Sequence, residues 1–211
     1  MVSLRQAMAW SLPSWEGTQG HFKGDTSKGL GGDWDGCSSS ICLWFALSMQ
    51  SYPIKTKIGD ISIIYDETSD QVTSVTLSSQ LPNHKRPPEK VKKFQWALTS
   101  YFQGKQVPPS LEMQLKGTSF QKKVWRELLH IPFGQTRSYH EIAKSIGHAK
   151  ACRAVGTAVS KNPYLILIPC HRVLKNDGSI GGFAWGTEIK KILLDHEKTF
   201  SSKANLLWLP Y

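Results

Sequence analysis

The residues best suited to chemistry in this chain form the run IPCHRV, from Ile168 to Val173. In this run a thiol stands beside an imidazole and a guanidinium, directly after a proline. A positive environment lowers a cysteine pKa from about 8.5 into a range of roughly 3.5 to 7.5 in known reactive thiols. The thiolate is the nucleophilic form, so we expect Cys170 to have a lowered pKa and to be reactive. A cysteine beside a histidine also arises by chance, so the dipeptide alone does not establish reactivity.

Cys170 and His171 are neighbours in the sequence, which argues against a direct hydrogen bond between their side chains. Consecutive side chains of an extended segment point to opposite sides. Proton transfer from the thiol to the imidazole would then need a bridging water or a folded-back turn. His171 also needs an acid to fix its tautomer, and we expect this acid to be Glu197, with Asp195 as the alternative.

A second candidate feature is a pair of short helices expected at residues 138–146 and 150–160. They are joined by a turn at residues 147–149 that contains glycine, an arrangement that suggests a helix-turn-helix. The second helix carries small residues and a single arginine, Arg153, whereas helices that read the major groove carry longer polar side chains. This pattern suits the minor groove, where an inserted side chain can open the base stack. The alternative is an ordinary packed helix with a solvated arginine.

The distribution of charge is a third indication. The chain has 211 residues, with 26 basic and 16 acidic ones, a formal net charge of +10 and a pI near 9.5. Residues 1–47 carry three basic and four acidic residues, so the positive excess lies entirely beyond them. A basic domain attracts polyanions, of which nucleic acid is the commonest. The alternative is a soluble protein that is merely cationic.

Composition excludes several other classes of protein. Hydrophobic residues make up 40% and charged residues 20%, as in soluble globular proteins. No apolar run approaches the roughly 18 residues of a spanning helix, and Ile41–Leu47 lacks the basic flank of a signal peptide. Four cysteines without a C-x-x-C pair indicate reduced thiols. A zinc site of Cys37 and Cys42 with His21 or His84 fits no common ligand spacing.

The chain is expected to have an α/β fold with two folded units between tails. Residues 1–50 are rich in glycine and serine without a period, so we expect a disordered or extraneous tail, with Met49 as a possible functional start. Residues 51–115 are expected to form a small α/β domain. It has antiparallel strands at 55–65, around a Gly59-Asp60 turn, and at 72–77, followed by a helix at 88–102. Pro108-Pro109 is expected to lie in a linker.

The second unit, residues 116–200, is expected to be mainly helical, with the helix-turn-helix and an active-site cysteine loop. Its first helix follows Thr118, and its last helix covers residues 187–196. Between them, residues 164–168 have the apolar pattern of a short strand. Residues 201–211 are expected to be a C-terminal tail.

From Gly117 to Glu197 the sequence resembles the active-site domain of O6-alkylguanine-DNA alkyltransferases, also called methylated-DNA–protein-cysteine methyltransferases. Several motifs occur in a consistent order and spacing, which is more specific than any one motif. Residues 50–115 resemble the small α/β N-terminal domain of the family more weakly, and residues 1–47 show no counterpart. The matching motifs are GTSFQ (117–121), IPFG (131–134), SY (138–139), RAVG (153–156), KNP (161–163), IPCHRV (168–173), GGF (181–183) and LLDHE (193–197).

The resemblance implies a DNA-repair protein that flips O6-alkylguanine, and less well O4-methylthymine, out of duplex DNA. The alkyl group would pass irreversibly to Cys170, so each chain would act once. His171 would act through water and Glu197 would orient it. Tyr139 would assist protonation of the departing guanine, and Lys190 would lie near the thiol.

The resemblance also implies the residues that bind DNA and the base. Arg153 would fill the gap left by the flipped nucleotide, and Asn162 would brace the turn before the active-site loop. The other implied DNA contacts are Ala151, Ala154, Gly156, Thr118 and Arg172. The implied substrate pocket consists of Phe183, Ala184, Trp185 and Val173. Relatives often have a small residue at the position of Trp185, which here either narrows the entrance or forms a stacking wall.

The implied partner is double-stranded DNA bearing O6-alkylguanine, bound by a monomer without any membrane association. No metal or organic cofactor is needed, and the zinc ligands that some relatives carry are not evident. The expected location is the cytoplasm, with the nucleoid, in a bacterium and the nucleus in a eukaryote. Two other functions fit the residues: a module that binds alkylated DNA without repairing it, and a thiol hydrolase using Cys170, His171 and Glu197. Non-catalytic relatives have replaced the acceptor cysteine, so Cys170 favours the enzyme.

Overall fold

The computed structural model describes residues 48–78, 86–105 and 111–206, with side chains described up to Ser201. The expected tail at residues 1–47, the expected linker at Pro108-Pro109 and the candidate zinc ligands Cys37, Cys42, His21 and His84 lie outside these residues. In the described part of the chain, no helix has the length and apolar character that crossing a bilayer requires.

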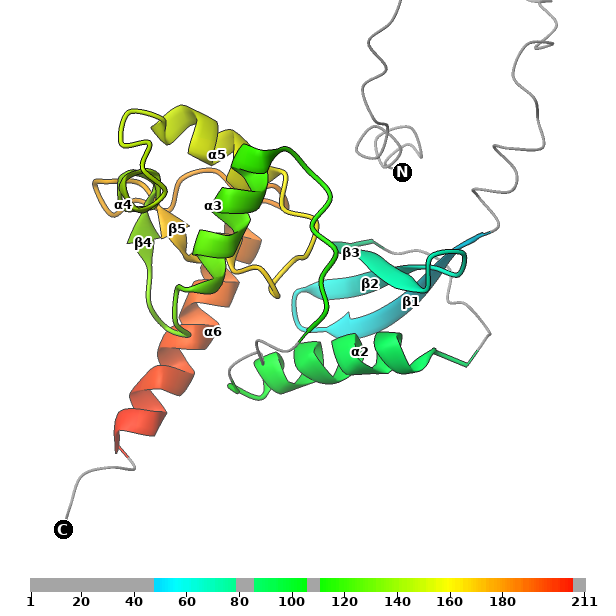
Figure 1. Cartoon of the computed structure of the whole chain (residues 1–211). Helices are drawn as coiled ribbons and strands as arrows, with labels where there is room; N and C mark the ends of the chain where they lie inside the picture. Colours follow the sequence, from blue (N-terminus) through cyan, green and yellow to red (C-terminus); the bar gives the residue numbers. More distant parts are fainter. Residues whose placement is uncertain (1–47, 79–85, 106–110, 207–211) are drawn as a thin grey trace, which may run out of the picture. The chain divides into compact units, whose positions relative to one another are not determined.

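The first element is a three-stranded antiparallel sheet in the order β1-β2-β3 (Figure 1). Its strands are β1 (Met49–Thr56), β2 (Gly59–Asp66) and β3 (Gln71–Leu77). Thr56 pairs with Gly59, so the turn falls at residues 57–58 rather than at Gly59-Asp60 as predicted. Gly59 has a φ of +114°, which favours glycine immediately after a tight turn. The sheet also begins at Met49, inside the stretch predicted to be a tail.

Helix α2 (Glu89–Phe102) packs along this sheet (Figure 1) and confirms the helix predicted at 88–102. Its apolar residues recur at helical spacing, so they form one face. Val91, Leu98 and Tyr101 on this face are completely buried, whereas Trp96 on another face is 62% exposed. Tyr101, near the C-terminal end of this buried face, therefore lies in the interior of the protein.

Three helices follow: α3 (Ser119–Leu129), α4 (Tyr139–Ser145) and α5 (Cys152–Ser160). Capping boxes begin the first two, because Thr118 and Ser138 each cap the backbone N–H three residues later. Gly147, with a φ of +79°, turns the chain between α4 and α5. The two short helices and the turn therefore lie where the sequence predicted them.

The segment from Tyr164 to Ile168 was predicted to be a strand, and this prediction is wrong. Ile166 has a φ of +69°, and the Ile168 N–H donates to the Tyr164 carbonyl, so the chain folds back in a turn. Tyr164 alone pairs with a strand, through one bridge to Val75 of β3. A short apolar run indicates burial in either conformation, which explains the error.

A single 3-10 turn at Cys170–Arg172 comes next, followed by β5 (Val173–Leu174), which pairs in parallel with β4 (Arg137–Ser138). The last element is α6 (Thr187–Leu206). It is longer than the predicted helix at 187–196, so residues 201–206 are helical rather than part of a tail. Within this helix the Phe200 ring packs against the His196 ring one turn earlier, with ring centroids 4.8 Å apart.

Candidate active site

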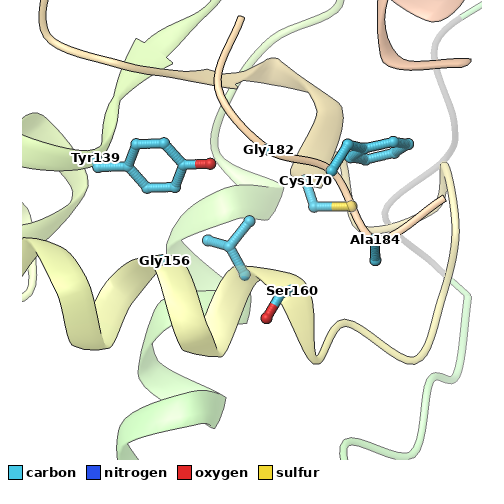
Figure 2. Close-up of a pocket in the computed structure, with 8 residues that line it drawn as sticks. Tyr139, Gly156, Ser160, Cys170, Gly182 and Ala184 are labelled. Carbon is cyan, nitrogen blue, oxygen red and sulfur yellow. The ribbon is translucent and has the colours of Figure 1, made fainter. Parts of the chain in front are cut away.

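Cys170 lies at the wall of a cavity of about 250 Å³ and is only 2% exposed. The cavity is lined by residues of α4, α5, the cysteine turn and the glycine-rich loop before α6 (Figure 2). In Figure 2 the Tyr139 hydroxyl is directed across the cavity toward the side occupied by Cys170 and Gly182. The residues that line the cavity are Tyr139, Gly156, Val159, Ser160, Cys170, Gly182, Phe183 and Ala184.

The thiol of Cys170 does not have the lowered pKa that the sequence predicted. Burial raises the pKa of Cys170 to about 11, although a hydrogen bond from Asn162 and the positive charge of Lys190 act in the opposite direction. The prediction failed because neighbours in the sequence indicated charge but not burial. In the free protein the thiol is therefore protonated at neutral pH, and its reaction needs a proton acceptor.

His171 and Glu197 form a buried pair, as predicted. His171 Nε2 lies 2.7 Å from Glu197 Oε1, and the two side chains are 0% and 1% exposed. Burial opposes ionisation of this carboxyl, yet hydrogen bonds from His171 and Arg172 and the positive charge of Arg172 lower the pKa of Glu197 to about 2. The ionised carboxylate can only accept, so His171 donates to it from Nε2. The alternative acid, Asp195, is exposed elsewhere on α6.

This pairing leaves the other ring nitrogen of His171 as the acceptor. Burial lowers the pKa of His171, so the ring is neutral, and Nδ1 then carries the lone pair. Nδ1 is buried and has no hydrogen-bonding partner among the described residues. His171 therefore presents a basic nitrogen in the same turn as the thiol.

Arg172 was predicted to contact DNA, and the structure corrects this prediction. Its side chain is 6% exposed, and its guanidinium donates to both carboxylate oxygens of Glu197 over 2.9 to 3.1 Å. Nη1 donates to the Ile131 carbonyl over 2.6 Å. Arg172 thus neutralises a buried carboxylate. Its side chain is buried and is not placed to contact DNA.

Lys190 is completely buried near the thiol, as the resemblance to the family implied. Its ammonium donates to the carbonyl of Val173 over 2.6 Å and to that of Ile180. Burial lowers the pKa of Lys190 to about 8, while the charge of an ionised Cys170 would raise it. The lysine and the thiolate therefore stabilise each other.

Asn162 occupies the turn after α5, as predicted, and it is 5% exposed. Its side-chain nitrogen lies 3.0 Å from Cys170 Sγ, 2.8 Å from the Ile168 carbonyl and 3.2 Å from the Tyr164 carbonyl. Its side-chain oxygen accepts from the Tyr164 N–H. One amide thus connects the end of α5 to the nucleophile.

Of the other residues predicted to contact DNA, four lie on or just before α5, and the fifth, Thr118, lies at the start of α3. Arg153 and Ala154 are exposed, and Ala151 is the residue just before the helix. Gly156 lines the cavity one turn further on. Thr118 is exposed at the start of α3, where its hydroxyl accepts from Gln121 N.

The predicted substrate pocket is partly corrected by the structure. Phe183 and Ala184 line the cavity, whereas Trp185 and Val173 do not. Trp185 Nε1 lies 3.3 Å from Thr76 Oγ1 of β3, and Val173 is completely buried in β5. Trp185 therefore does not form a wall of this cavity, but its ring packs against that of Phe183, which does, with centroids 5.3 Å apart.

Three residues of the lining were missed in the sequence: Val159, Ser160 and Gly182. Val159 and Ser160 lie three and four residues after Gly156 and thus on the same face of α5. Helical spacing from Gly156 could have identified both of them. Gly182 stands in the GGF motif, but a glycine gives no chemical signal of its own.

Comparison with known proteins identifies the family. The family model described as "6-O-methylguanine DNA methyltransferase, DNA binding domain" matches residues 119–199. A protein of Acanthamoeba polyphaga mimivirus named "Probable methylated-DNA–protein-cysteine methyltransferase" is 45% identical over 146 residues, or 69% of this chain and 94% of that protein. The inducible methylated-DNA–protein-cysteine methyltransferase of Bacillus subtilis is 42% identical over 118 residues, or 56% of this chain and 66% of that protein.

Solved structures agree with these relatives. The Mycobacterium tuberculosis OGT, crystallised in complex with DNA, superposes with a TM-score of 0.62 at 36% identity, covering 72% of this chain and 94% of that one. A second structure, of the O6-methylguanine methyltransferase of the same organism, gives a TM-score of 0.60 at 34% identity over 72% of this chain and 93% of that one. The catalytic-loop motifs, the fold and the relatives lead to one conclusion: the chain belongs to the family of methylated-DNA–protein-cysteine methyltransferases.

Proposed function

We propose that this protein repairs duplex DNA by moving an alkyl group from O6 of guanine to the sulfur of Cys170. The observation that carries this proposal is the cavity of about 250 Å³ that contains both the Cys170 sulfur and the Tyr139 hydroxyl. Its volume suits a single nucleobase rather than a longer ligand. The similarity to a family member crystallised with DNA supports DNA as the partner.

The damaged base must leave the double helix to reach this sulfur. Cys170 is 2% exposed at the wall of the cavity, so a stacked base cannot approach it. Extruding a nucleotide costs a few kcal/mol, and less when the base pair is already damaged. Arg153, exposed at the start of α5, is the side chain proposed to occupy the space left in the stack.

The transfer itself is a displacement at the alkyl carbon. The thiol gives its proton through a water to His171 Nδ1, whose opposite nitrogen is held by Glu197 at 2.7 Å. The sulfur then attacks the carbon, the carbon–oxygen bond breaks, and its electron pair remains on the guanine. A proton delivered to the base by way of Tyr139 makes the leaving group neutral. In the overall balance the thiol exchanges its hydrogen for the alkyl group, and guanine receives a hydrogen instead.

The electrostatics of the site support this order of events. Burial raises the pKa of Cys170 to about 11, so the resting thiol is protected from unwanted reactions until a proton acceptor is engaged. Lys190 then stabilises the thiolate. Burial and the nearby Cys170 raise the pKa of Tyr139, so its hydroxyl keeps the proton that the leaving group needs.

The product is a thioether, which offers no low-energy leaving group for the reverse reaction. We therefore propose that each chain acts once. O4-methylthymine is the proposed weaker substrate, because its single ring fills less of the same cavity.

The direct test is mass spectrometry of the full chain after incubation with a DNA duplex containing one O6-methylguanine. The chain should gain the mass of one methyl group, mapped to the peptide with Cys170. Cys170→Ser should gain none, whereas the matched Cys152→Ser variant should react fully. Binding of the duplex without an adduct would favour a lesion-binding module, and repeated turnover of an ester would favour a hydrolase.

A further inference from the structure

Tyr101, a residue of α2, contacts both His171 and Glu197, which lie far from it in the sequence. Its hydroxyl donates to Glu197 Oε1 over 2.9 Å and lies 3.4 Å from His171 Nε2. The residue is completely buried, and 70 positions separate it from His171. The first folded part of the chain therefore contributes a polar group to the reactive site.

The hydroxyl of Tyr101 shares one carboxylate oxygen with His171. Glu197 Oε1 accepts from Tyr101, from His171 and from the Arg172 guanidinium. Oε2 accepts from Arg172 Nε and from the Gly134 N–H over 2.8 Å. Donors converging on a buried carboxylate both fix its orientation and disperse its negative charge.

We propose that Tyr101 is a positioning residue for the alkyl transfer: its hydroxyl holds the Glu197 carboxylate against His171 and limits the basicity of that imidazole. The proposal rests on the function proposed above, because His171 there accepts the thiol proton. A more basic His171 would hold a proton of its own at higher pH and could not take the one from Cys170.

The hydroxyl can act as a donor throughout the pH range of the reaction. Burial, followed by the negative charge of Glu197, raises the pKa of Tyr101 well above its ordinary value. Tyr101 thus remains neutral and protonated wherever duplex DNA is stable. The other charged or titratable groups facing His171 are Arg172 and Lys190, which both lower its pKa, and the Cys170 thiol beside it.

The ring of Tyr101 has a packing role that can be separated from the role of the hydroxyl. Its centroid lies 5.3 Å from Phe102, 5.8 Å from Phe133 and 5.3 Å from His196. His196 is thus a neighbour of Tyr101: its Nε2 lies 3.0 Å from the Tyr101 carbonyl. Its Nδ1 lies 2.5 Å from Lys57 Nζ. Phenylalanine at position 101 would keep the ring contacts and remove only the hydroxyl.

The test compares Tyr101→Phe with Tyr164→Phe by single-turnover methyl transfer over a range of pH. Tyr164 is a matched control, because it is also completely buried but its hydroxyl donates to the carbonyls of Val72 and Gln114. Tyr101→Phe should slow the transfer at neutral pH by roughly tenfold, the effect of one hydrogen bond to a charged group. It should also move the acid limb of the pH profile to higher pH, whereas Tyr164→Phe should leave that limb in place.

A second substitution at position 101 should shift the acid limb of the pH profile in the opposite direction. Site-specific 3-fluorotyrosine at position 101 is a stronger donor of nearly the same volume, so it should move the acid limb to lower pH. The NMR resonance of the His171 Nε2 proton should shift in opposite directions in the two Tyr101 variants, which provides a reading independent of activity.

Identical pH profiles and unshifted resonances in both Tyr101 variants would overturn the positioning role. This outcome is distinct from failure of the proposed function, which would appear as wild-type protein unable to acquire a methyl group on Cys170. If Tyr101→Phe fails to fold, the fluorotyrosine variant still decides the question, because it keeps both the ring and the hydroxyl.

Discussion

The side-chain nitrogen of Asn162 donates to the sulfur of Cys170 over 3.0 Å while also contacting the carbonyls of Tyr164 and Ile168. The amide therefore secures the turn and adjusts the acidity of the thiol at the same time. The hydrogen bond lowers the pKa of Cys170, against the larger effect of burial. Shape and reactivity of the site are consequently coupled through one residue.

Asn162→Ala should increase the pKa of Cys170 above its value of about 11, because the thiolate loses a donor. It should also lower the free energy of unfolding by about 2 kcal/mol, since two buried carbonyls lose a partner. Thiolate absorbance during a pH titration measures the first effect, and urea unfolding measures the second. Asn176→Ala, in the exposed part of the loop after β5, is the control and should change neither quantity.

Glu197→Gln should destabilise the protein by roughly 3 to 5 kcal/mol, because it leaves the buried Arg172 without its counter-charge. It should also slow methyl transfer, because the neutral amide of glutamine accepts a weaker hydrogen bond from His171 than the charged carboxylate of Glu197 does. Asp195→Asn removes a negative charge from the exposed surface of the same helix and should alter both properties little. Equal unfolding curves for the two variants would contradict the buried ion pair.

Stability should decrease in acid because of the same carboxylate. The pKa of Glu197 is lowered from 4.5 to about 2, so the unfolded chain binds a proton at a higher pH than the folded chain does. The stabilisation is complete above pH 4.5 and disappears as the pH falls through 2; it amounts to on the order of 3 kcal/mol. Unfolding free energies of wild type and Glu197→Gln, measured between pH 6 and pH 2.5, should converge as the pH falls. Parallel curves would argue against this assignment.

Arg153→Ala should slow repair of duplex DNA while leaving the fold intact, because the Arg153 side chain is exposed on the surface of the described part of the chain. The fluorescence of a 2-aminopurine placed beside the lesion should report less base extrusion. Arg153→Lys retains the charge but not the planar guanidinium, and thus separates the electrostatic contribution from insertion into the stack. A wild-type repair rate in Arg153→Ala would remove this residue from the flipping step.

The sequence predicted the elements and residues whose signals are local. The helices at 89–102 and 119–129 follow from periodic apolar residues, from the prolines before the first helix and from Thr118 before the second, and the structure confirms both. The helices depend on neighbours along the chain, which the sequence displays directly. Glu197 was proposed as the acid for His171 although 26 residues separate them, because His171 needs an acid and the last helix ends near Glu197.

The features that the sequence did not predict depend on tertiary contacts. The family resemblance implied that Arg172 contacts DNA, but its guanidinium turns inward to meet a carboxylate 25 residues away. Tyr101 lies in a helix where aromatic spacing indicates core packing, and nothing nearby shows that its hydroxyl meets Glu197. The prediction of a lowered pKa for Cys170 was wrong for the same reason, because the thiol becomes buried only when distant segments of the chain pack around it.

Helix α6 carries Lys190 and Glu197 seven residues apart. This spacing is close to two helical turns, so Lys190, near the sulfur, and Glu197, which pairs with His171, project from the same side of α6. A shift or rotation of this helix would therefore move both charged groups relative to the cysteine turn. The placement of α6 thus sets the electrostatics of the sulfur and of the imidazole together.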